Sequence, residues 1–284
     1  RILRIFNNTS KTIIMNNKKP LFSIATPCWN SADTIERTIK SVLSQEFKDY
    51  EYIIVDGGST DGTLDIVKKY EPLFEGRMIW NSEPDKGLYD AFNKGIERSC
   101  GAYCWNVNAD DYLAPHALSK LAKFIQDSNW GGNLPVISGI LNFVSRDGSV
   151  IFSQLKSNPK YMEKCFKKDH IGVPHPATLV PRNIYNKYGG FDVHFKILGD
   201  ADWFHRVYGA GEKFAFANFV IVNMADGGVS NAFNYKKSLR DRKYYLKKYY
   251  PSFLERYTKL LLWTLSFFKQ KIEHRISQCR IVKI

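Results

Sequence analysis

Two adjacent carboxylates follow an apolar segment in the middle of the chain. Residues 102–107 are mostly hydrophobic and lead directly to Asn108, Asp110 and Asp111. Neighbouring negative charges repel each other, so open water or a cation has to offset the repulsion. In proteins, Mg²⁺ and Mn²⁺ are commonly held by one or two carboxylates together with a substrate diphosphate. The pattern therefore predicts either a divalent-cation site or a turn before a helix, because Asn and Asp also favour such turns.

Two other polar stretches could carry chemistry. DGGSTDGT at residues 56–63 is rich in glycine and could bring backbone N–H groups close to a ligand. It lacks the Gly-Lys-Ser/Thr of a Walker loop and the spacing of a dinucleotide fingerprint, so a plain turn is the alternative. In GDADWFHR, Asp200 and Asp202 could include a general base. They could equally be acids that the helix dipole favours at a helix N-terminus.

The segments around these residues alternate between strand and helix patterns. Strands are predicted at residues 21–26, 50–56, 77–80 and 102–107, and helices at residues 62–70 and 88–99. Such alternation indicates βαβ units, and hence a parallel sheet with right-handed crossovers. Ligands of open parallel sheets bind beyond the carboxyl ends of the strands. The segments TPCWNS, DGGSTDGT and NADD are therefore predicted to share one site.

Local signals predict where other elements begin. The spacing of Asp33 and Glu36 is that of a capping box before a further helix. Pro115 suits the first position of the helix that follows the acid pair. From about residue 135 the pattern is mixed. Here the turn signal RDGS separates the apolar segments 135–144 and 150–154, which predicts a β-hairpin.

Composition excludes several classes of protein. The five cysteines are an odd number without CxxC spacing, which favours reduced thiols over a disulfide framework or a zinc knuckle. The six histidines show no HExxH spacing, and no GxSxG supports a serine nucleophile. The longest apolar run near the C-terminus, LLLWTLSFF, is too short to cross a bilayer, so no transmembrane helix is predicted.

The polar segments together resemble a known family. PLFSIATPCWNSAD, YIIVDGGSTDGT, SEPDKGLYDAFNKGI and GAYCWNVNADDYLAP are similar to the donor half of a family-2 glycosyltransferase of the GT-A fold, and GVPHPATLVPRNIYNKYGGFD with ILGDADWFHRV to its acceptor half. The resemblance covers residues 20–230. It implies a Rossmann-like, mostly parallel sheet flanked by helices, with a mixed acceptor-side half. The expected regions are an extension at 1–19, the transferase domain at 20–234 (divided into 20–130 and 131–234), and a helical C-terminal extension at 235–284.

On the donor side, the resemblance implies roles for residues that bind the nucleotide sugar. Thr26 and Pro27 are expected to line the nucleotide pocket, and Asp56 to lie beside the base. Asp85 and Lys86 are expected in the loop that covers the nucleotide and its phosphates.

The DXD-type metal motif of the family falls on Asn108-Ala109-Asp110. By resemblance, Asp110 binds Mn²⁺ or Mg²⁺, and Asp111 supports the metal or the donor sugar. The chain departs from the family at two positions. Gly57 replaces an acid that often recognises uracil, and Asn108 replaces the first acid of the motif and can still hydrogen-bond a ribose. The first departure weakens the expectation of a uridine donor.

On the acceptor side, Asp200 matches the acid commonly assigned as the catalytic base, and His175 and Asp202 are expected to line the acceptor cleft. The implied reaction is a single in-line displacement that inverts the anomeric carbon. Lys86 and the metal would stabilise the departing diphosphate. Two alternatives remain: a nucleotidyltransferase, and a catalytically inactive glycan-binding or scaffold subunit.

The C-terminal fifty residues carry most of the charge. Residues 235–284 hold 14 Lys and Arg against 3 Asp and Glu, a net charge of +11 out of +13 for the whole chain. Aromatic residues and leucines alternate with these cations, which favours an anionic membrane surface over nucleic acid. Packing of a solvated basic helix on the body is the alternative. We expect a lipid-linked or oligosaccharide acceptor, no nucleic acid, and a cytoplasmic, peripheral position on the inner face of the plasma membrane.

Overall fold

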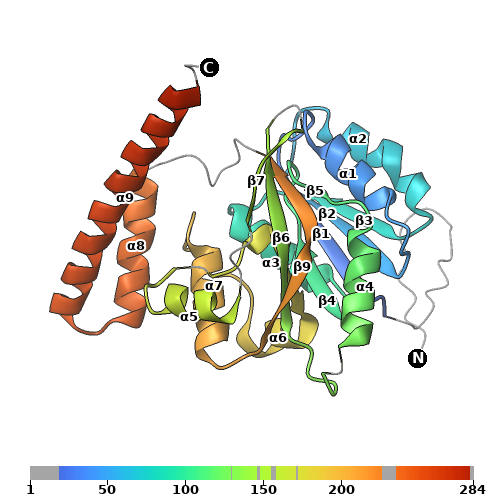
Figure 1. The fold of residues 1–284 in the computed structure, drawn as a ribbon. Coiled ribbons are helices and arrows are strands. Elements are labelled where there is room, and N and C mark those ends of the chain that lie inside the picture. Colours follow the sequence, from blue (N-terminus) through green and yellow to red (C-terminus); the bar gives the residue numbers. More distant parts are fainter. Residues whose placement is uncertain are drawn as a thin grey trace.

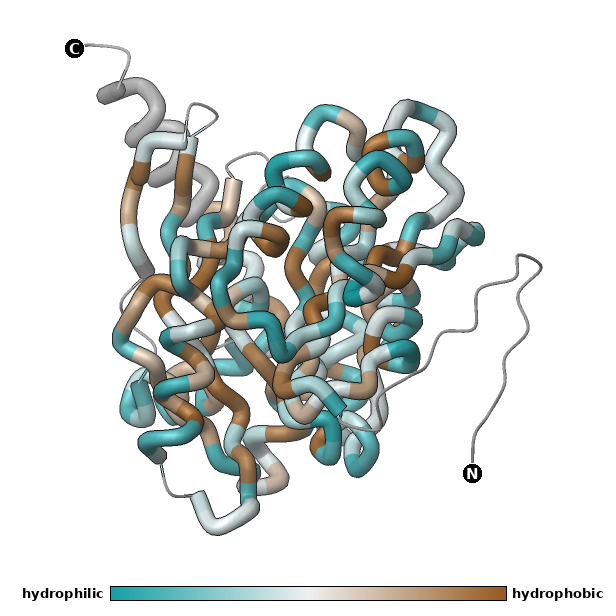
Figure 2. The backbone as a smooth tube through the Cα atoms, turned by 90° about the vertical axis from the view of Figure 1, so that its right-hand side faces the viewer, coloured by the Kyte–Doolittle hydropathy of each residue, from teal (hydrophilic) through white to brown (hydrophobic). Residues whose placement is uncertain are grey.

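The computed structural model describes residues 19–128, 130–145, 148–154, 158–170, 172–225 and 235–281, without the side chains of residues 154 and 270–281. One curved sheet forms the centre of the molecule, with helices on both sides (Figure 1). Hydrophobic stretches concentrate on its inner strands (Figure 2). Except for Lys19, the expected N-terminal extension lies outside the described residues.

The first half of the chain forms the predicted parallel unit. Strand β1 pairs with β2 and β4, and β2 with β3, all in parallel. The bounds are β1 Phe22–Cys28, α1 Ile35–Leu43, β2 Tyr50–Asp56, α2 Thr63–Tyr70, η1 Glu71–Phe74, β3 Met78–Ser82, α3 Leu88–Arg98, β4 Tyr103–Asn106, β5 Tyr112–Leu113 and α4 Ala117–Asp127. The predicted strands are confirmed to within two residues at each end.

The second half is mixed, as expected. Its elements are β6 Val136–Val144, β7 Val150–Gln154, α5 Pro159–Phe166, η2 His175–Ala177, β8 Thr178–Pro181, α6 Arg182–Tyr188, α7 Gly199–Gly209 and β9 Phe214–Ala225. Strands β6 and β7 form the predicted antiparallel hairpin. The sheet order is β3-β2-β1-β4-β8-β6-β9-β5, with β7 on β6. Strand β8 is antiparallel to both β4 and β6, and it joins the two halves into one sheet.

Both predicted helix starts are wrong. Helix α1 begins after Thr34, without a side-chain cap, because Glu36 binds Tyr70 at 2.6 Å and Lys69 at 3.0 Å on the neighbouring helix instead. Helix α4 begins at Ala117, two residues after Pro115. His116, which lies between Pro115 and Ala117, has a φ of 59°. This is a left-handed conformation that does not fit in a right-handed α-helix.

Two large hydrophobic clusters lie on opposite faces of the sheet. The first packs α1, α2 and α4 against inward-facing residues such as Ile24, Tyr52 and Trp105. The second joins α3, α6 and α7 around the fully buried Trp203. Alternate residues of each strand point to opposite faces, so the almost continuously apolar strands can supply both clusters.

The C-terminal region consists of α8 (Tyr235–Tyr249) and α9 (Phe253–Ile281), which stand side by side at one edge of the molecule (Figure 1). Helix α8 contributes Tyr245 and Leu246 to the second hydrophobic cluster, so it is part of the packed body. Helix α9 exposes much of its apolar surface instead. Across the described part of the chain, no helix combines the length and hydrophobicity needed to cross a bilayer.

A pair of leucine truncations tests this difference between the two helices. Leu246 on α8 is 2% exposed, whereas Leu262 on α9 is 66% exposed. We expect Leu246→Ala to lower the free energy of unfolding by about 2–5 kcal/mol, because it leaves a cavity in the core. Leu262→Ala should change it by less than about 0.5 kcal/mol. Urea denaturation of both variants measures the difference. Equal effects would show that α8 is not part of the core.

Candidate functional site

The loops that follow β1 and β2 are joined by hydrogen bonds at the carboxyl edge of the sheet. The backbone N–H of Asn30 donates to Ser59 Oγ at 2.8 Å, and Asn30 Oδ1 accepts from the N–H of Thr60 at 2.9 Å. Asp61 Oδ2 accepts from the N–H of Ala32 at 3.0 Å. The TPCWNS and DGGSTDGT segments therefore form one rim, as the sequence predicts.

Asp56 organises this rim from below. It is fully buried, and its carboxylate accepts hydrogen bonds from the side chains of Ser59 and Ser82 and from the N–H of Gly58. Burial by itself would raise the pKa of Asp56, but the hydrogen bonds from Ser59 and Ser82 outweigh it and lower that pKa. The side chain is thus committed to holding the loop, which leaves the loop backbone to face a ligand.

A glycine gives a second acid access to the rim. A Cβ on Gly57 would lie 2.4 Å from Asp85 Oδ2 and 3.4 Å from Trp29 Cβ, so these three residues are in close contact. Asp85 Oδ1 also accepts from the N–H of Gly87 at 2.8 Å. The carboxylate of Asp85, from the loop after β3, therefore fills the space beside Gly57.

Trp29 is a feature of the rim that sequence reasoning missed. It is 66% exposed, although it directly follows the buried strand β1. Its position in TPCWNS was the available signal. In contrast, Thr26 and Pro27 are buried, and Thr26 Oγ1 accepts a hydrogen bond from Tyr52 at 3.1 Å. Their side chains therefore support the rim from within the sheet.

The acid pair lies at the same edge, after β4. Asp111 is buried, and its oxygens accept from Asn108 Nδ2 at 3.1 Å and from the N–H of Ala225 at 3.3 Å. Burial, with the neighbouring charge of Asp110, raises the pKa of Asp111 to about 8. Burial also raises the pKa of Asp110, whose carboxylate makes no hydrogen bond to another described side chain.

These residues fit a divalent cation. The pair is poorly neutralised by the protein, and Asn108 Oδ1 is buried with no hydrogen-bond partner among the described residues. No group of three or more His, Cys, Asp or Glu side chains converges in the part of the chain that the structure describes. The oxygens of Asp110, Asp111 and Asn108 are of the kind that Mg²⁺ and Mn²⁺ prefer, and one or two carboxylates suffice where substrate phosphates complete the ligand set.

Helix α1 holds the acid loop in place. Arg37 donates to Asp110 O at 2.8 Å, and Thr38 Oγ1 donates to Asp111 O at 2.6 Å. Ser41 Oγ accepts from the N–H of Leu113 at 3.0 Å. Sequence reasoning missed these three polar residues. Their clustering on a helix with an otherwise apolar inner face was the only signal.

Asp200 lies in the first turn of α7. Its Oδ1 accepts from the N–H of Ala201 at 2.8 Å and lies 3.4 Å from the Tyr89 hydroxyl. Protein atoms crowd the carboxylate, although part of the residue remains accessible to solvent, and this burial raises its pKa to about 6. Oδ2 has no hydrogen-bond partner among the described residues. Asp200 can therefore accept a proton near neutral pH.

Asp202, two residues further along α7, is placed very differently. It is fully buried and is bound by Arg206 at 3.1 Å, Lys248 at 2.7 Å and Tyr249 at 2.8 Å. The last two residues belong to α8. Asp202 therefore ties α8 to α7, and its carboxylate is already satisfied.

His175 packs against three aromatic rings. The ring centroids of Phe92, Phe191 and Phe204 lie 4.9, 5.4 and 6.2 Å from that of the imidazole. Burial lowers the pKa of His175 to about 4, so the ring is neutral at physiological pH. The structure therefore gives this histidine a packing role, in addition to its predicted place in the acceptor cleft.

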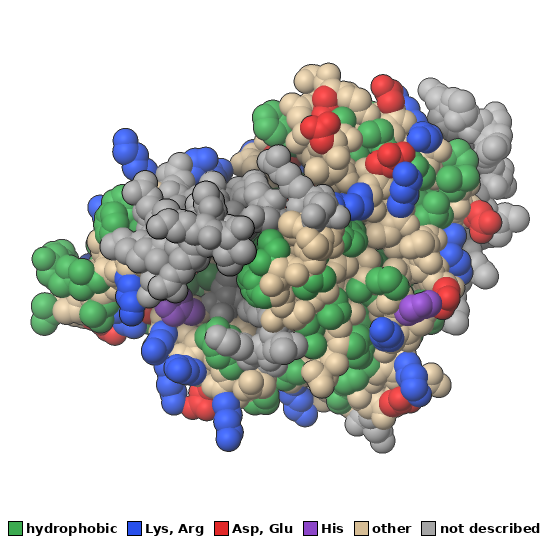
Figure 3. All heavy atoms as spheres, turned by 45° about the horizontal axis from the view of Figure 1, so that its top comes forward, with side chains coloured by type: hydrophobic (Ala, Val, Ile, Leu, Met, Phe, Trp, Pro, Cys, Tyr) green, Lys and Arg blue, Asp and Glu red, His purple; other side chains and the backbone are tan. Residues whose placement is uncertain are grey.

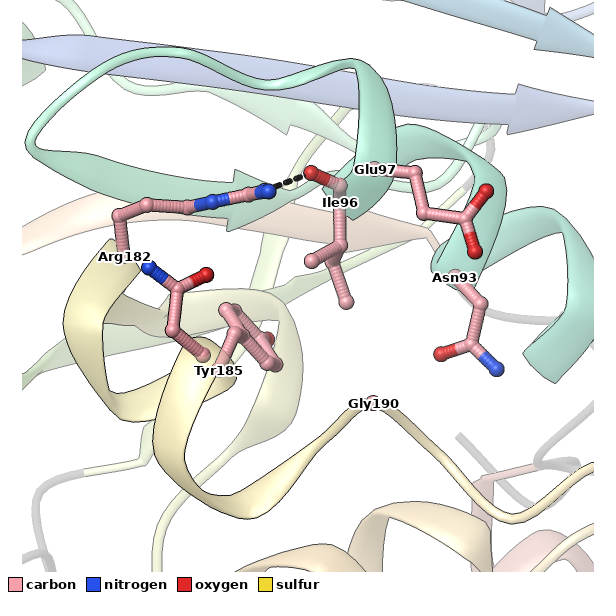
Figure 4. Close-up of a pocket in the computed structure, with 7 residues that line it drawn as sticks. Asn93, Ile96, Glu97, Arg182, Tyr185 and Gly190 are labelled. Atoms are coloured by element: carbon pink, nitrogen blue, oxygen red, sulfur yellow. Dashed lines mark hydrogen bonds between the residues drawn. The ribbon is translucent and has the colours of Figure 1, made fainter.

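A small surface pocket lies away from these acids. It is lined by Asn93, Ile96 and Glu97 of α3, by Arg182, Tyr185 and Asn186 of α6, and by Gly190. Figure 4 shows Arg182 reaching across it to Ile96 O. The pocket contains none of the residues that the sequence predicts for the site.

Comparison with known proteins agrees with the arrangement. Residues 23–189 match the family model "Glycosyl transferase family 2". A PGL/p-HBAD biosynthesis glycosyltransferase of Mycobacterium bovis is 29% identical over 229 residues, which cover 78% of this chain and 83% of that protein. A Bacillus subtilis protein named for teichuronic acid biosynthesis, TuaG, is 41% identical over 113 residues, covering 40% of this chain and 45% of TuaG.

A solved structure shares the fold. Residues 1–349 of Staphylococcus aureus TarS, in complex with UDP-GlcNAc, superpose with a TM-score of 0.63. The alignment covers 84% of this chain and 69% of that one at 18% identity. The predicted GT-A architecture is thereby confirmed.

A glycine substitution tests whether the close contact between Gly57 and Asp85 contributes to nucleotide binding. The methyl group of Gly57→Ala would overlap the Asp85 carboxylate and displace it. We expect UDP to bind roughly tenfold more weakly, a loss of about 1.4 kcal/mol. Gly62→Ala is the control, because its Cβ would meet only Ala32 Cβ at 3.8 Å. Calorimetric titration with UDP measures both variants. Unchanged affinity in Gly57→Ala would show that the position of Asp85 does not matter for UDP binding.

Proposed function

Because the chain belongs to glycosyl transferase family 2, we propose that it transfers a sugar from a UDP-sugar to a hydroxyl group of a lipid-linked glycan in cell-surface polysaccharide synthesis. The observation that carries the proposal is the contrast between the acids. Asp200 keeps an unpartnered oxygen and a pKa of about 6, whereas the nearby Asp202 is fully neutralised. A general base needs a pKa near the working pH and a free oxygen.

The rim of the sheet suits the nucleotide. Trp29 presents an exposed ring, and the backbone of the Gly57 loop and the Asp85 carboxylate offer polar groups beside it. Lys86 directly follows Asp85 and is exposed, so its ammonium group can stabilise the negative charge of a departing diphosphate. Asp56 contributes indirectly, because it holds the loop.

Asp110 is the residue that would hold Mn²⁺ or Mg²⁺. Asp111 and Asn108 are joined beside it by a hydrogen bond, and the unpartnered Oδ1 of Asn108 is a further candidate ligand. When bound, the cation would supply positive charge to offset the charge of the diphosphate. The protein's own part is to keep these groups together on the short loop that α1 anchors.

The reaction that these groups support is direct displacement. The N–H of Ala201 holds Oδ1 of Asp200, which leaves Oδ2 to accept the proton of an acceptor hydroxyl. That hydroxyl attacks the anomeric carbon as the bond to the diphosphate breaks. A single displacement of this kind inverts the configuration of the sugar.

The exposed face of α9 supports a position at the membrane. Its large apolar side chains recur every three or four residues, so they lie along one side of the helix: Phe253, Leu254, Tyr257, Leu261, Leu262, Leu265 and Phe268. In Figure 3, hydrophobic side chains gather at the edge where α8 and α9 stand, with Lys and Arg nearby. An apolar stripe on a region of net charge +11 fits an anionic leaflet. We place the protein on the cytoplasmic face, where lipid-linked glycans are extended.

Two substitutions separate the roles of the acids. Asp110→Ala should weaken metal-dependent UDP binding and slow turnover, because the cation would lose its ligand. Asp200→Asn should leave UDP affinity unchanged but lower kcat by about 10²–10⁴-fold, because the base is lost. Calorimetry with UDP and Mn²⁺, alongside UDP release from a panel of UDP-hexoses with water or a glycan as acceptor, measures both effects.

The pH profile is the internal control. Asp200 must be ionised to accept a proton, so the rate of the wild-type enzyme should rise through about pH 6 and level off above it. Asp200→Asn should lose this rise. A kcat above half of the wild-type value in Asp200→Asn would exclude Asp200 as the base. UDP binding without any turnover would instead favour an inactive binding subunit.

Membrane binding is tested on the α9 face. The double variant Leu254→Glu/Leu262→Glu places charges on the apolar stripe and should reduce cosedimentation with phosphatidylglycerol vesicles by about tenfold or more. Leu73→Glu, at an exposed leucine of η1, is the matched control and should bind like wild type. Unchanged sedimentation of the double variant would contradict membrane docking by this face. Loss of a dimer in light scattering would assign the face to a second copy of the chain instead.

A further inference from the structure

A buried acid of α8 holds the backbone just before the helix that carries Asp200. Asp241 is fully buried, and its Oδ2 accepts hydrogen bonds from three consecutive backbone N–H groups, those of residues 196–198, at 2.7, 2.6 and 3.2 Å. Its Oδ1 pairs with Arg240 at 3.1 Å. Hydrogen bonds to an ionised acceptor are among the strongest in proteins, so this segment is firmly anchored to α8.

The anchored segment contacts the donor side and the base at the same time. Lys196 Nζ donates to Lys86 O at 3.0 Å, and Tyr89 donates to Ile197 O at 2.6 Å. The same Tyr89 hydroxyl lies 3.4 Å from Asp200 Oδ1. The loop that carries Lys86, helix α3 and the first turn of α7 therefore meet at this segment.

We propose that Asp241 is a positioning residue that sets the orientation of Asp200 for proton transfer. This inference rests on the proposed role of Asp200 as the base. Without the carboxylate of Asp241, three buried N–H groups lose their acceptor, and the backbone two residues before Asp200 has to move to find others. Misplacement of a catalytic group by about 1 Å can lower a rate by about 100-fold.

Asp241 belongs to the C-terminal region of the chain. It lies on α8, beyond residues 23–189 that match the family model. The basic C-terminal region therefore does more than cover the body: its first helix completes the geometry of the acceptor side.

A second acid offers a matched control. Asp192 also ties the loop before α7 to α8, through Tyr244 at 3.1 Å and Lys248 at 3.2 Å. Its Oδ1 accepts from the N–H of His194 at 3.1 Å, further from Asp200, whereas the N–H groups of residues 196–198 donate to Asp241. Its loss should therefore cost stability, as the loss of Asp241 does, without moving the backbone before Asp200.

The experiment compares Asp241→Ala, Asp192→Ala and Asp200→Asn in the intact chain. For each variant, kcat for UDP release is measured with a UDP-hexose that the wild type turns over, together with UDP affinity and the unfolding midpoint. Asp241→Ala removes the acceptor of the three N–H groups, so we expect it to lower kcat by about tenfold or more with UDP affinity within about twofold. Asp192→Ala should lower the unfolding midpoint but keep kcat within about twofold. If Asp241→Ala is too unstable to assay, Asp241→Asn replaces it. The amide keeps an acceptor oxygen but loses the negative charge that strengthens the three hydrogen bonds, so kcat should fall by about threefold or more.

The outcomes distinguish the inference from its premise. A kcat of Asp241→Ala, or of Asp241→Asn in its place, equal to wild type would overturn the positioning role, as would an equal loss in Asp192→Ala. If Asp200→Asn itself retains wild-type kcat, the assignment of the base fails first. A large loss in Asp200→Asn with none in Asp241→Ala leaves the base in place and removes only the positioning residue.

Discussion

The parallel pairing of β1 with β2 and β4 determines where the polar groups of the donor side can lie. The register places Cys28 opposite Asp56 on one side of β1, and Ala25 opposite Asn106 on the other. All three strands therefore end at one edge of the sheet. The N–H of Gly57 donates to Cys28 O at 2.8 Å, which continues the alignment into the loops. The loops that follow these strands are far apart in the sequence but begin at the same edge of the sheet. The parallel register of the hydrogen bonds therefore brings them together.

The acids of the molecule fall into two groups according to how well the protein neutralises them. Asp56 and Asp241 are buried with several donors on each carboxylate, so they act as fixed anchors. Burial raises the pKa of Asp110, Asp111 and Asp200, because the protein offers these acids too few donors or cations. Incompletely satisfied acids cost folding free energy, and such groups tend to be retained where a ligand or a proton completes them.

The second half of the chain is joined to the first half through the sheet and through shared hydrophobic packing. Strand β8 connects the two half-sheets, and Tyr89 of α3 reaches from the donor half to Ile197 and Asp200. Helix α8 closes the arrangement from outside through its hydrogen bonds and its buried Leu246. Asp200 therefore occupies a position defined by three elements, although α7 alone carries it.

The first four strands along the chain, the hairpin and the grouping of motifs at one edge could be predicted from sequence, because apolar runs and turn residues indicate local conformation. The order of the strands in the sheet came from the structure. Helix starts could not: Glu36 and Pro115 carry favourable local signals, but Glu36 binds α2 and His116 adopts a left-handed conformation. The clearest limit is the pair Asp200 and Asp202. Both are aspartates of one helical turn, and the sequence determined that acids stand there. Tertiary packing decided their chemistry. Arg206 of α7 and Lys248 of α8 neutralise the Asp202 carboxylate, and Tyr249 donates a hydrogen bond to it. Asp200 is left without a partner for one of its oxygens among the described residues.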